Sequence, residues 1–279
     1  MRLLDYASNV FSQSGEDGII NKVLETLTAK DKWCVEFGAW DGQHLSNTCN
    51  LIENYGYNAV LIEGDPERAI DLRRRYCGKP NINVFNRFVG FGTDDGLDSI
   101  LAQSAIPQNF DILSIDIDGN DYHVWKAVEK YTPKVVCIEY NPTIPSEVEF
   151  VQPADPEVNH GSSLLSLNML SLTKNYRLVA VTSLNAIFVQ AKYFPQFGIA
   201  NNDPATLRET CPAVAHIFCG YDGTIFIKGQ ERLLWHDLQY KARIRQLPRM
   251  FRLYPGNFGI TKAFIYKVYQ QFCRLVGRG

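Results

Sequence analysis

The chain has 279 residues, of which 46% are hydrophobic, and its formal net charge is −2. That is enough apolar sequence to bury a full core, most simply in one α/β domain with additions. The first residues contain no apolar signal segment and no stretch approaches 18 apolar residues, so the sequence predicts neither export nor a membrane span. Seven scattered cysteines without a C-x-x-C pair favour a reducing compartment, and we expect a cytoplasmic protein.

Strand and helix patterns alternate through the first half of the chain. Each expected strand is a short apolar run rich in β-branched residues, and each expected helix has its apolar residues on one face. We predict strands at 32–37, 58–62, 81–85, 110–116 and 134–140, and helices near 19–27, 51–55, 66–76, 97–101 and 121–128. Such units build an α/β fold with a doubly wound, Rossmann-like and mostly parallel sheet, joined by right-handed crossovers.

The alternation changes after the fifth strand. Residues 142–162 are a polar stretch with four prolines, which is too long for a simple connector and is expected to act as a substrate lid. A helix over 164–174 precedes two apolar runs, 176–181 and 186–189, which we predict to be a terminal antiparallel pair. Residues 193–230 show no clear period.

The glycine loop after the first strand carries the strongest functional signal. Val35 to Gly42 read V-E-F-G-A-W-D-G, so Trp40 occupies the position where a dinucleotide-binding loop has its second glycine. That glycine lets backbone amides approach a pyrophosphate, whereas Glu36 would repel a phosphate and suit a cationic ligand. The next strand ends at Glu63, where a carboxylate accepts hydrogen bonds from both ribose hydroxyls. The loop therefore favours S-adenosylmethionine (SAM) over NAD.

Oxygen-bearing side chains end the fourth and fifth strands. Asp116 ends the fourth strand, while Glu139 and Asn141 lie at or just beyond the end of the fifth. Adjacent parallel strands are about 4.8 Å apart, so these groups can converge on a hard divalent cation such as Mg²⁺ or Mn²⁺. The structural alternative is a turn and helix cap over residues 118–121, with Glu139 and Asn141 holding the following loop.

Three histidines are candidate bases. His123, near the start of a helix, and His160, in the polar stretch, could act with Asp116 as bases that remove a proton from the substrate. His44 could lie beside the sulfonium group of SAM. For each histidine, an ordinary helix or loop residue is the competing interpretation. The sequence shows no nucleophile and base in motif context, so covalent catalysis is not indicated.

Five motifs in this order resemble the FkbM-type SAM-dependent methyltransferases, from Phe11 to about Val189. They are Ser12–Asp17, Val35–Gly42, Leu61–Asp65, Ser114–Tyr122 and Ile138–Pro142. The fourth motif differs from the family pattern: many members have a shorter acidic-glycine form, whereas this chain has Asp-Gly-Asn-Asp-Tyr. The resemblance implies a class I methyltransferase sheet with an antiparallel last strand, and O-methylation of glycans or secondary metabolites. Together the motifs give ten candidate cofactor-binding residues: Gln13, Glu16, Glu36, Gly38, Ala39, Asp41, Gly42, Glu63, Asp65 and Asp116.

The end of the chain differs in charge from the rest. Residues 231–279 contain ten lysines and arginines against Glu231 and Asp237, which leaves residues 1–230 acidic. We therefore predict a methyltransferase domain at 1–230 and a basic helical extension at 231–279, which lies outside the resemblance. The extension has no nucleic-acid-binding motif, so we expect it to bind an anionic membrane surface or an acidic glycan. In the first case the protein would be peripheral at a membrane. Solvated helices without a ligand are the alternative.

The function that these observations favour is transfer of a methyl group from SAM to a hydroxyl of a sugar or glycan. An oxygen of phosphate type, or one on a secondary metabolite, is an alternative acceptor. A nucleotide-dependent oxidoreductase or epimerase is a rival class, against which Trp40 argues. A third class is a binding module without catalytic activity, and the complete set of acidic residues argues against it.

Overall fold

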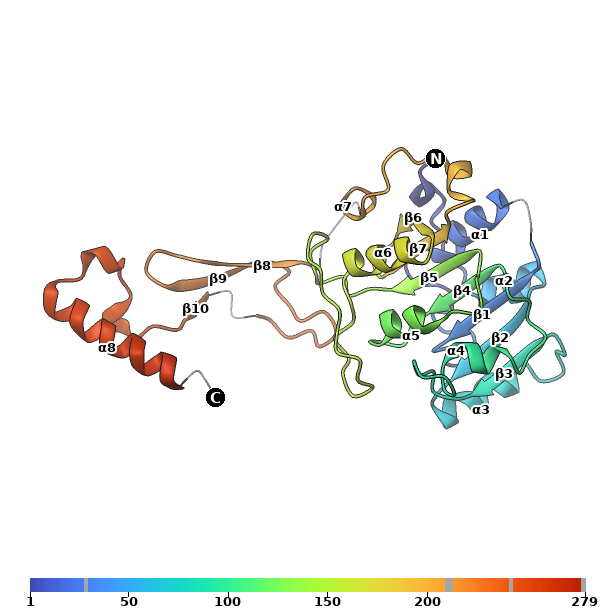
Figure 1. Cartoon of the computed structure of the whole chain (residues 1–279), viewed down its shortest axis with the longest axis horizontal. Helices are drawn as coiled ribbons and strands as arrows, with labels where there is room; N and C mark the ends of the chain where they lie inside the picture. Colours follow the sequence, from blue (N-terminus) through green and yellow to red (C-terminus); the bar gives the residue numbers. More distant parts are fainter. Residues whose placement is uncertain (28–29, 209–212, 241–242, 277–279) are drawn as a thin grey trace. The chain divides into compact units, whose positions relative to one another are not determined.

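The computed structural model describes residues 1–27, 30–208, 213–240 and 243–276 (Figure 1). Its internal contacts divide the chain into two compact units, Met1–Cys211 and Pro212–Gly279, and each is described by itself. Among the described residues, no helix is both long enough and apolar enough to cross a membrane.

The first unit is built on a seven-stranded sheet with the order β3-β2-β1-β4-β5-β7-β6. Six strands are parallel, and β7 runs antiparallel to both of its neighbours. The strands are β1 Trp33–Phe37, β2 Asn58–Glu63, β3 Ile82–Asn86, β4 Ile112–Ile115, β5 Val135–Glu139, β6 Tyr176–Val181 and β7 Asn185–Gln190. This confirms the predicted doubly wound fold with the antiparallel last strand of the class I methyltransferases.

Helices cover both faces of this sheet, because its strands are apolar on both sides. One core layer joins α4, α5 and α6 to inward residues such as Val35 and Phe37 of β1, and the opposite layer joins α1, α2 and α3 to Cys34. The α-helices are α1 Glu16–Thr26, α2 Cys49–Tyr55, α3 Pro66–Arg75, α4 Leu97–Leu101, α5 Asp121–Ala127, α6 Leu164–Thr173 and α7 Pro204–Leu207, with 3₁₀ helices at Leu3–Tyr6 and Phe194–Phe197. All six helices expected in this unit therefore form.

Two of these helices begin as their sequences predict. The Asp65 carboxylate accepts hydrogen bonds from the first free amides of α3, directly before Pro66. The Ser163 hydroxyl accepts one from the Ser166 amide at the start of α6. Capping of this kind contributes about 1 kcal/mol each and fixes where the loops at the carboxyl edge of the sheet turn into helices.

The amino end of the sheet holds a buried ion pair, Lys134 and Asp111, which the half-exposed Asp31 joins. Lys134 is buried, and its Nζ lies 2.7 Å from a carboxylate oxygen of Asp111 and 2.5 Å from one of Asp31. Asp111 also accepts hydrogen bonds from the backbone amides of Asp31 and Lys32. A buried carboxylate is stable when it is paired and hydrogen-bonded in this way.

The second unit contains a three-stranded antiparallel sheet followed by a helix. The sheet has the order β10-β9-β8, with β8 at Ala215–Cys219, β9 at Thr224–Gly229 and β10 at Arg243–Arg245. Short 3₁₀ helices at Arg249–Phe251 and Pro255–Asn257 lead to α8, Ile260–Val276. The helix agrees with the expected helical extension, whereas the sheet was not predicted. The boundary predicted after residue 230 falls within this unit, between the paired strands β9 and β10.

Candidate active site

Gly38 brings the carboxyl ends of β1 and β4 into contact. Its φ is +74°, a conformation that side-chain-bearing residues rarely adopt, and an added Cβ would lie 1.8 Å from the backbone oxygen of Asp116. Glycine is therefore required here by the approach of the two strand ends.

Glu36 holds the loop that follows the glycine turn. Its buried carboxylate accepts hydrogen bonds from the hydroxyls of Ser46, at 2.6 Å, and Thr48, at 2.7 Å, and from the Asn47 amide at 2.8 Å. Burial raises the pKa of Glu36, against the opposing effect of these three donors. The predicted cofactor residue Glu36 thus positions the loop between β1 and α2.

Glu63 lies at the end of β2 and links two loops. One carboxylate oxygen accepts the Trp40 amide at 2.8 Å, and the other accepts the Asp65 amide at 2.7 Å. A carboxylate oxygen accepts two hydrogen bonds, so each oxygen keeps one acceptor position for a ligand hydroxyl. The geometry is therefore compatible with the predicted ribose contact.

Two other predicted cofactor residues, Asp41 and Asp65, organise the backbone next to them. Asp41 accepts hydrogen bonds from the amides two and three residues further along, and Asp65 does the same as the cap of α3. Ala39 continues the sheet, since its amide donates to the backbone oxygen of Ile62. Gly42, with φ of +77°, turns the chain beneath the α3 side chain Leu72.

Trp40 stands where a dinucleotide-binding loop has its second glycine. Its φ is +48°, and its ring is 43% exposed with the Arg68 guanidinium 3.7 Å from the ring centroid. His44 lies edge-on to the same ring, at 5.4 Å. An indole held in this place by a cation–π contact keeps a pyrophosphate away from the loop backbone.

The polar segment before α1 is held by two buried acids. Glu16 accepts hydrogen bonds from the Thr182 hydroxyl at 2.6 Å and from the Asn185 amide group, which ties α1 to the β6–β7 hairpin. Asp17 accepts three backbone amides of residues 10–12. Of the two predicted cofactor residues in this segment, only Gln13 has an exposed side chain, while Glu16 is buried in the hairpin contact.

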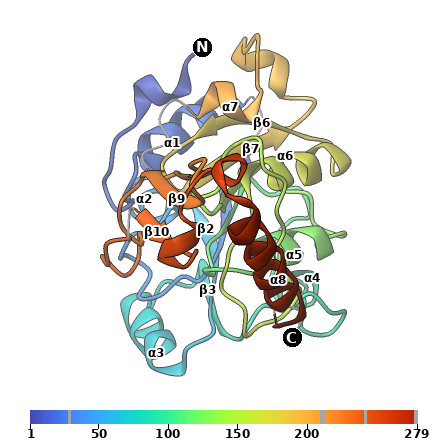
Figure 2. The same ribbon diagram turned by 90° about the vertical axis from the view of Figure 1, so that its left-hand side faces the viewer.

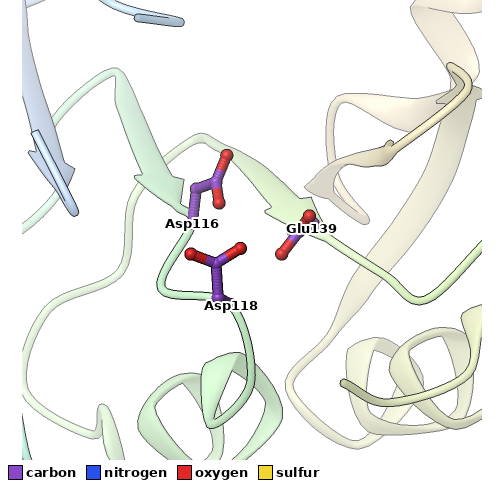
Figure 3. Close-up of side chains that lie close together, drawn as sticks. All are labelled: Asp116, Asp118 and Glu139. Atoms are coloured by element: carbon purple, nitrogen blue, oxygen red, sulfur yellow. The ribbon is translucent and has the colours of Figure 1, made fainter. Parts of the chain in front are cut away.

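Three carboxylates gather where β4 and β5 end. Asp116 follows β4, Asp118 lies in the turn before α5, and Glu139 is the last residue of β5, with their side chains directed toward one another (Figure 3). One oxygen of each lies within 4.8 Å of the others. Hard oxygen ligands at this spacing suit Mg²⁺ or Mn²⁺. The structure thus brings the predicted ligands Asp116 and Glu139 together and adds Asp118.

Asn141, the third predicted metal ligand, is engaged by the loop that follows β5. Its amide nitrogen donates to the backbone oxygen of His160 at 2.7 Å, and its amide oxygen accepts both the amide and the hydroxyl of Thr143. Both ends of the Asn141 side chain therefore have partners in the 142–161 loop. This agrees with the alternative interpretation, in which Asn141 holds the loop that follows β5.

Among the described residues, no salt bridge balances the charge of the carboxylate cluster. Burial first, and then the neighbouring Asp121 and Asp118, raise the pKa of Asp116 well above its ordinary value. Burial and the charge of Asp116 raise the pKa of Glu139 to about 10. In the described part of the chain no lysine or arginine forms a salt bridge with these acids, in contrast to Asp111 at the opposite end of the sheet. The cluster is thus a candidate site for a cation.

This charge predicts an unusual pH dependence of stability. Because folding raises the pKa of Glu139 from 4.5 to about 10, the folded chain retains a proton that the unfolded chain releases. In the presence of chelator, we expect the melting temperature to fall as pH rises from about 5 to about 9. Glu139→Gln should flatten this slope, whereas Glu157→Gln, in the exposed part of the loop, should leave it unchanged. A wild-type slope that equals the Glu139→Gln slope would contradict the assignment.

None of the three candidate histidines belongs to the group formed by Asp116, Asp118 and Glu139. His123 Nε2 is 2.8 Å from the backbone oxygen of Gln152. His160 is exposed, and its backbone amide donates to the buried Gln152 side chain. His44 packs beside Trp40. The structure therefore places these residues in loop contacts, and it gives none of them a position among the carboxylates.

Sequence reasoning missed three residues that shape the site. Asp118 was expected only as part of a turn; it lies in a turn, with φ of +56°, but its carboxylate also joins Asp116 and Glu139. Gln152 is buried and fastens the 142–162 stretch through bonds to three backbone groups. Phe88, 81% exposed after β3, packs its ring on Gly64, where an added Cβ would lie 2.8 Å away. The glycine directly after Glu63 was the feature of the sequence that could have indicated a close contact here.

Comparison with known proteins gives a fold likeness only. No family model matches the chain, and no curated protein does. The N-terminal domain of EvdMO1, solved in the presence of SAH and D-fucose, is 14% identical with a TM-score of 0.40, over 63% of this chain and 82% of that chain. A SAM-dependent methyltransferase from Aquifex aeolicus is 13% identical with a TM-score of 0.36, over 61% and 87%. The CurJ carbon methyltransferase is 10% identical with a TM-score of 0.42, over 65% and 56%. Likeness at this level assigns no activity, which has to be argued from the site.

Proposed function

We propose that the protein is a SAM-dependent O-methyltransferase of FkbM type that methylates a hydroxyl group of a sugar or glycan. The observation that carries the proposal is the carboxylate cluster of Asp116, Asp118 and Glu139 at the same sheet edge as Glu63. In doubly wound sheets, the carboxyl ends of the strands are where ligands bind. This edge therefore combines a ribose acceptor with a site for a cation.

The residues present fit SAM. Glu63 keeps one acceptor position on each oxygen for the two ribose hydroxyls. The exposed side chain of Phe88, which follows β3 and is separated from the cluster by the ends of β2 and β1, offers a flat apolar surface for the adenine. The acids at the ends of β4 and β5 favour a positively charged sulfonium over a negatively charged pyrophosphate. SAM supplies the reaction with an electrophilic methyl group.

The acceptor hydroxyl would be handled by the carboxylates. Asp116, Asp118 and Glu139 would hold a divalent cation, which supplies charge that lowers the pKa of a hydroxyl bound to it. The chain itself orients the acceptor at the strand ends and accepts its proton on a carboxylate oxygen of the cluster. The carboxylates of the cluster also favour a neutral hydroxyl over a phosphate-type oxygen, because any carboxylate that is ionised repels an anionic acceptor.

The cofactor assignment can be tested by binding. We expect SAM and S-adenosylhomocysteine to bind, and NAD(H) not to bind, because Trp40 fills the place of the pyrophosphate glycine. Isothermal titration calorimetry with each ligand measures this. Tighter binding of NAD than of SAM would contradict the proposal and support an oxidoreductase or epimerase.

A further inference from the structure

Helix α8, drawn in dark red in Figure 2, has an exposed face on which apolar side chains outnumber the polar Thr261 and Gln271. At 3.6 residues per turn, seven large side chains fall within just under half of its circumference. All of them are exposed, in fractions from 43% to 93%: Ile260, Phe264, Ile265, Val268, Phe272, Leu275 and Val276. An amphipathic helix in a globular protein normally turns this face to the core.

The opposite face of α8 is the one that packs against its own unit. The rings of Tyr266 and Tyr269 lie with centroids 5.2 Å and 5.3 Å from that of Phe251, which is 3% exposed. Tyr266 also meets Phe258 edge-on at 5.2 Å. The helix is thus anchored through its aromatic side, and the fold of the unit leaves the apolar side uncovered.

Positive charge borders the apolar face. On a helical projection Lys267 and Arg274 follow one edge of the face, beside Ile260, and Lys262 lies beyond the other edge. The described residues of this unit contain nine lysines and arginines against Asp222, Glu231 and Asp237. Long basic side chains in these positions keep their ammonium or guanidinium groups at a polar surface while the apolar face is buried.

We propose that α8 lies in the surface of an anionic lipid bilayer, with its apolar face in the acyl boundary and its basic residues among the headgroups. This inference does not depend on the proposed methyl transfer. Phe264 and Phe272 require an apolar environment, which an acidic glycan does not offer, and the excess of positive charge opposes pairing with a second copy of the chain. An anionic membrane satisfies both the apolar face and the charge.

The test is sedimentation of the full chain with vesicles. We expect binding to vesicles of phosphatidylserine and phosphatidylcholine in equal parts, much weaker binding to pure phosphatidylcholine, and loss of binding at high salt. The double variant Phe264→Ser/Phe272→Ser should lower the partition coefficient about tenfold or more. Lys267→Glu/Arg274→Glu should lower it by a similar factor.

Controls separate lipid binding from other causes. Ile70→Ser/Arg73→Glu changes exposed residues of the same types on α3 and should leave vesicle binding intact. Melting curves of all variants should match the wild type, since the substituted α8 side chains are exposed. Unchanged vesicle binding by both α8 variants would overturn the proposal. So would retention on immobilised hyaluronate without vesicle binding, or a wild-type dimer that Phe264→Ser/Phe272→Ser converts to monomers.

Discussion

Asp116→Asn should reduce methyl transfer by about 10²-fold or more while changing the affinity for SAM only slightly. Asp116 is the carboxylate at the end of β4 that faces both Asp118 and Glu139. Replacing it removes one hard ligand and one negative charge from the place where the acceptor hydroxyl is expected. The measurement is transfer of labelled methyl groups to a glycan extract, together with calorimetric titration of Mn²⁺ and of SAM.

Chelator should act on the wild-type protein as the substitution does, and added Mg²⁺ should restore the proposed activity. Glu157→Gln is the matched control, because it removes a carboxylate from the exposed part of the 142–162 loop. Full activity in chelator would exclude the cation, and full activity of Asp116→Asn would exclude Asp116 from the chemistry. Proton removal would then have to be sought at His123 and His160, before His44.

Glu63→Ala should weaken SAM and S-adenosylhomocysteine binding by about 1–3 kcal/mol, which corresponds to about 5-fold to 150-fold. The loss has two parts, because the carboxylate would accept the ribose hydroxyls and also holds the amides of Trp40 and Asp65. Calorimetry measures the affinity, and the melting temperature reports the structural part.

Glu67→Ala on the first turn of α3 is the control for Glu63→Ala. Glu67 has a side chain at the exposed start of the same helix, so its removal should leave the affinity for SAM unchanged. A variant Glu63→Ala that melts like the wild type and binds SAM with unchanged affinity would place the ribose elsewhere.

The main sheet could be predicted because its strands are buried on both faces. The residues of β2 and β5 are almost continuously apolar, and such runs identify a parallel strand without any knowledge of its neighbours. The strands β8 and β9 have only three consecutive apolar residues each, and Ile217 and Phe218 of β8 are 70% and 49% exposed. Strands are predicted from the hydrophobic pattern that burial in a core produces. The apolar side chains of this small sheet are exposed, so that pattern is missing and the sheet could not be predicted.

The location of the candidate site at the carboxyl edge of the sheet could be predicted, but the full set of residues that form it could not. Parallel strands end at one edge, which is why Asp116 and Glu139 could be expected to meet. Which oxygen completes the group depends on loop contacts far apart in the sequence. Asn141 is held by His160, 19 residues away, and Glu16 by Thr182, 166 residues away. No local pattern encodes such pairs.

The two hydrogen bonds that Glu63 accepts have a consequence for how this protein can evolve. A carboxylate that fixes the glycine loop through Trp40 and the start of the next helix through Asp65 cannot be exchanged for another residue without disturbing both. A lineage that changed its cofactor would need a compensating substitution in the loop before, or together with, the change at position 63. Substitution at position 63 is therefore epistatically constrained by the glycine loop and by the start of α3.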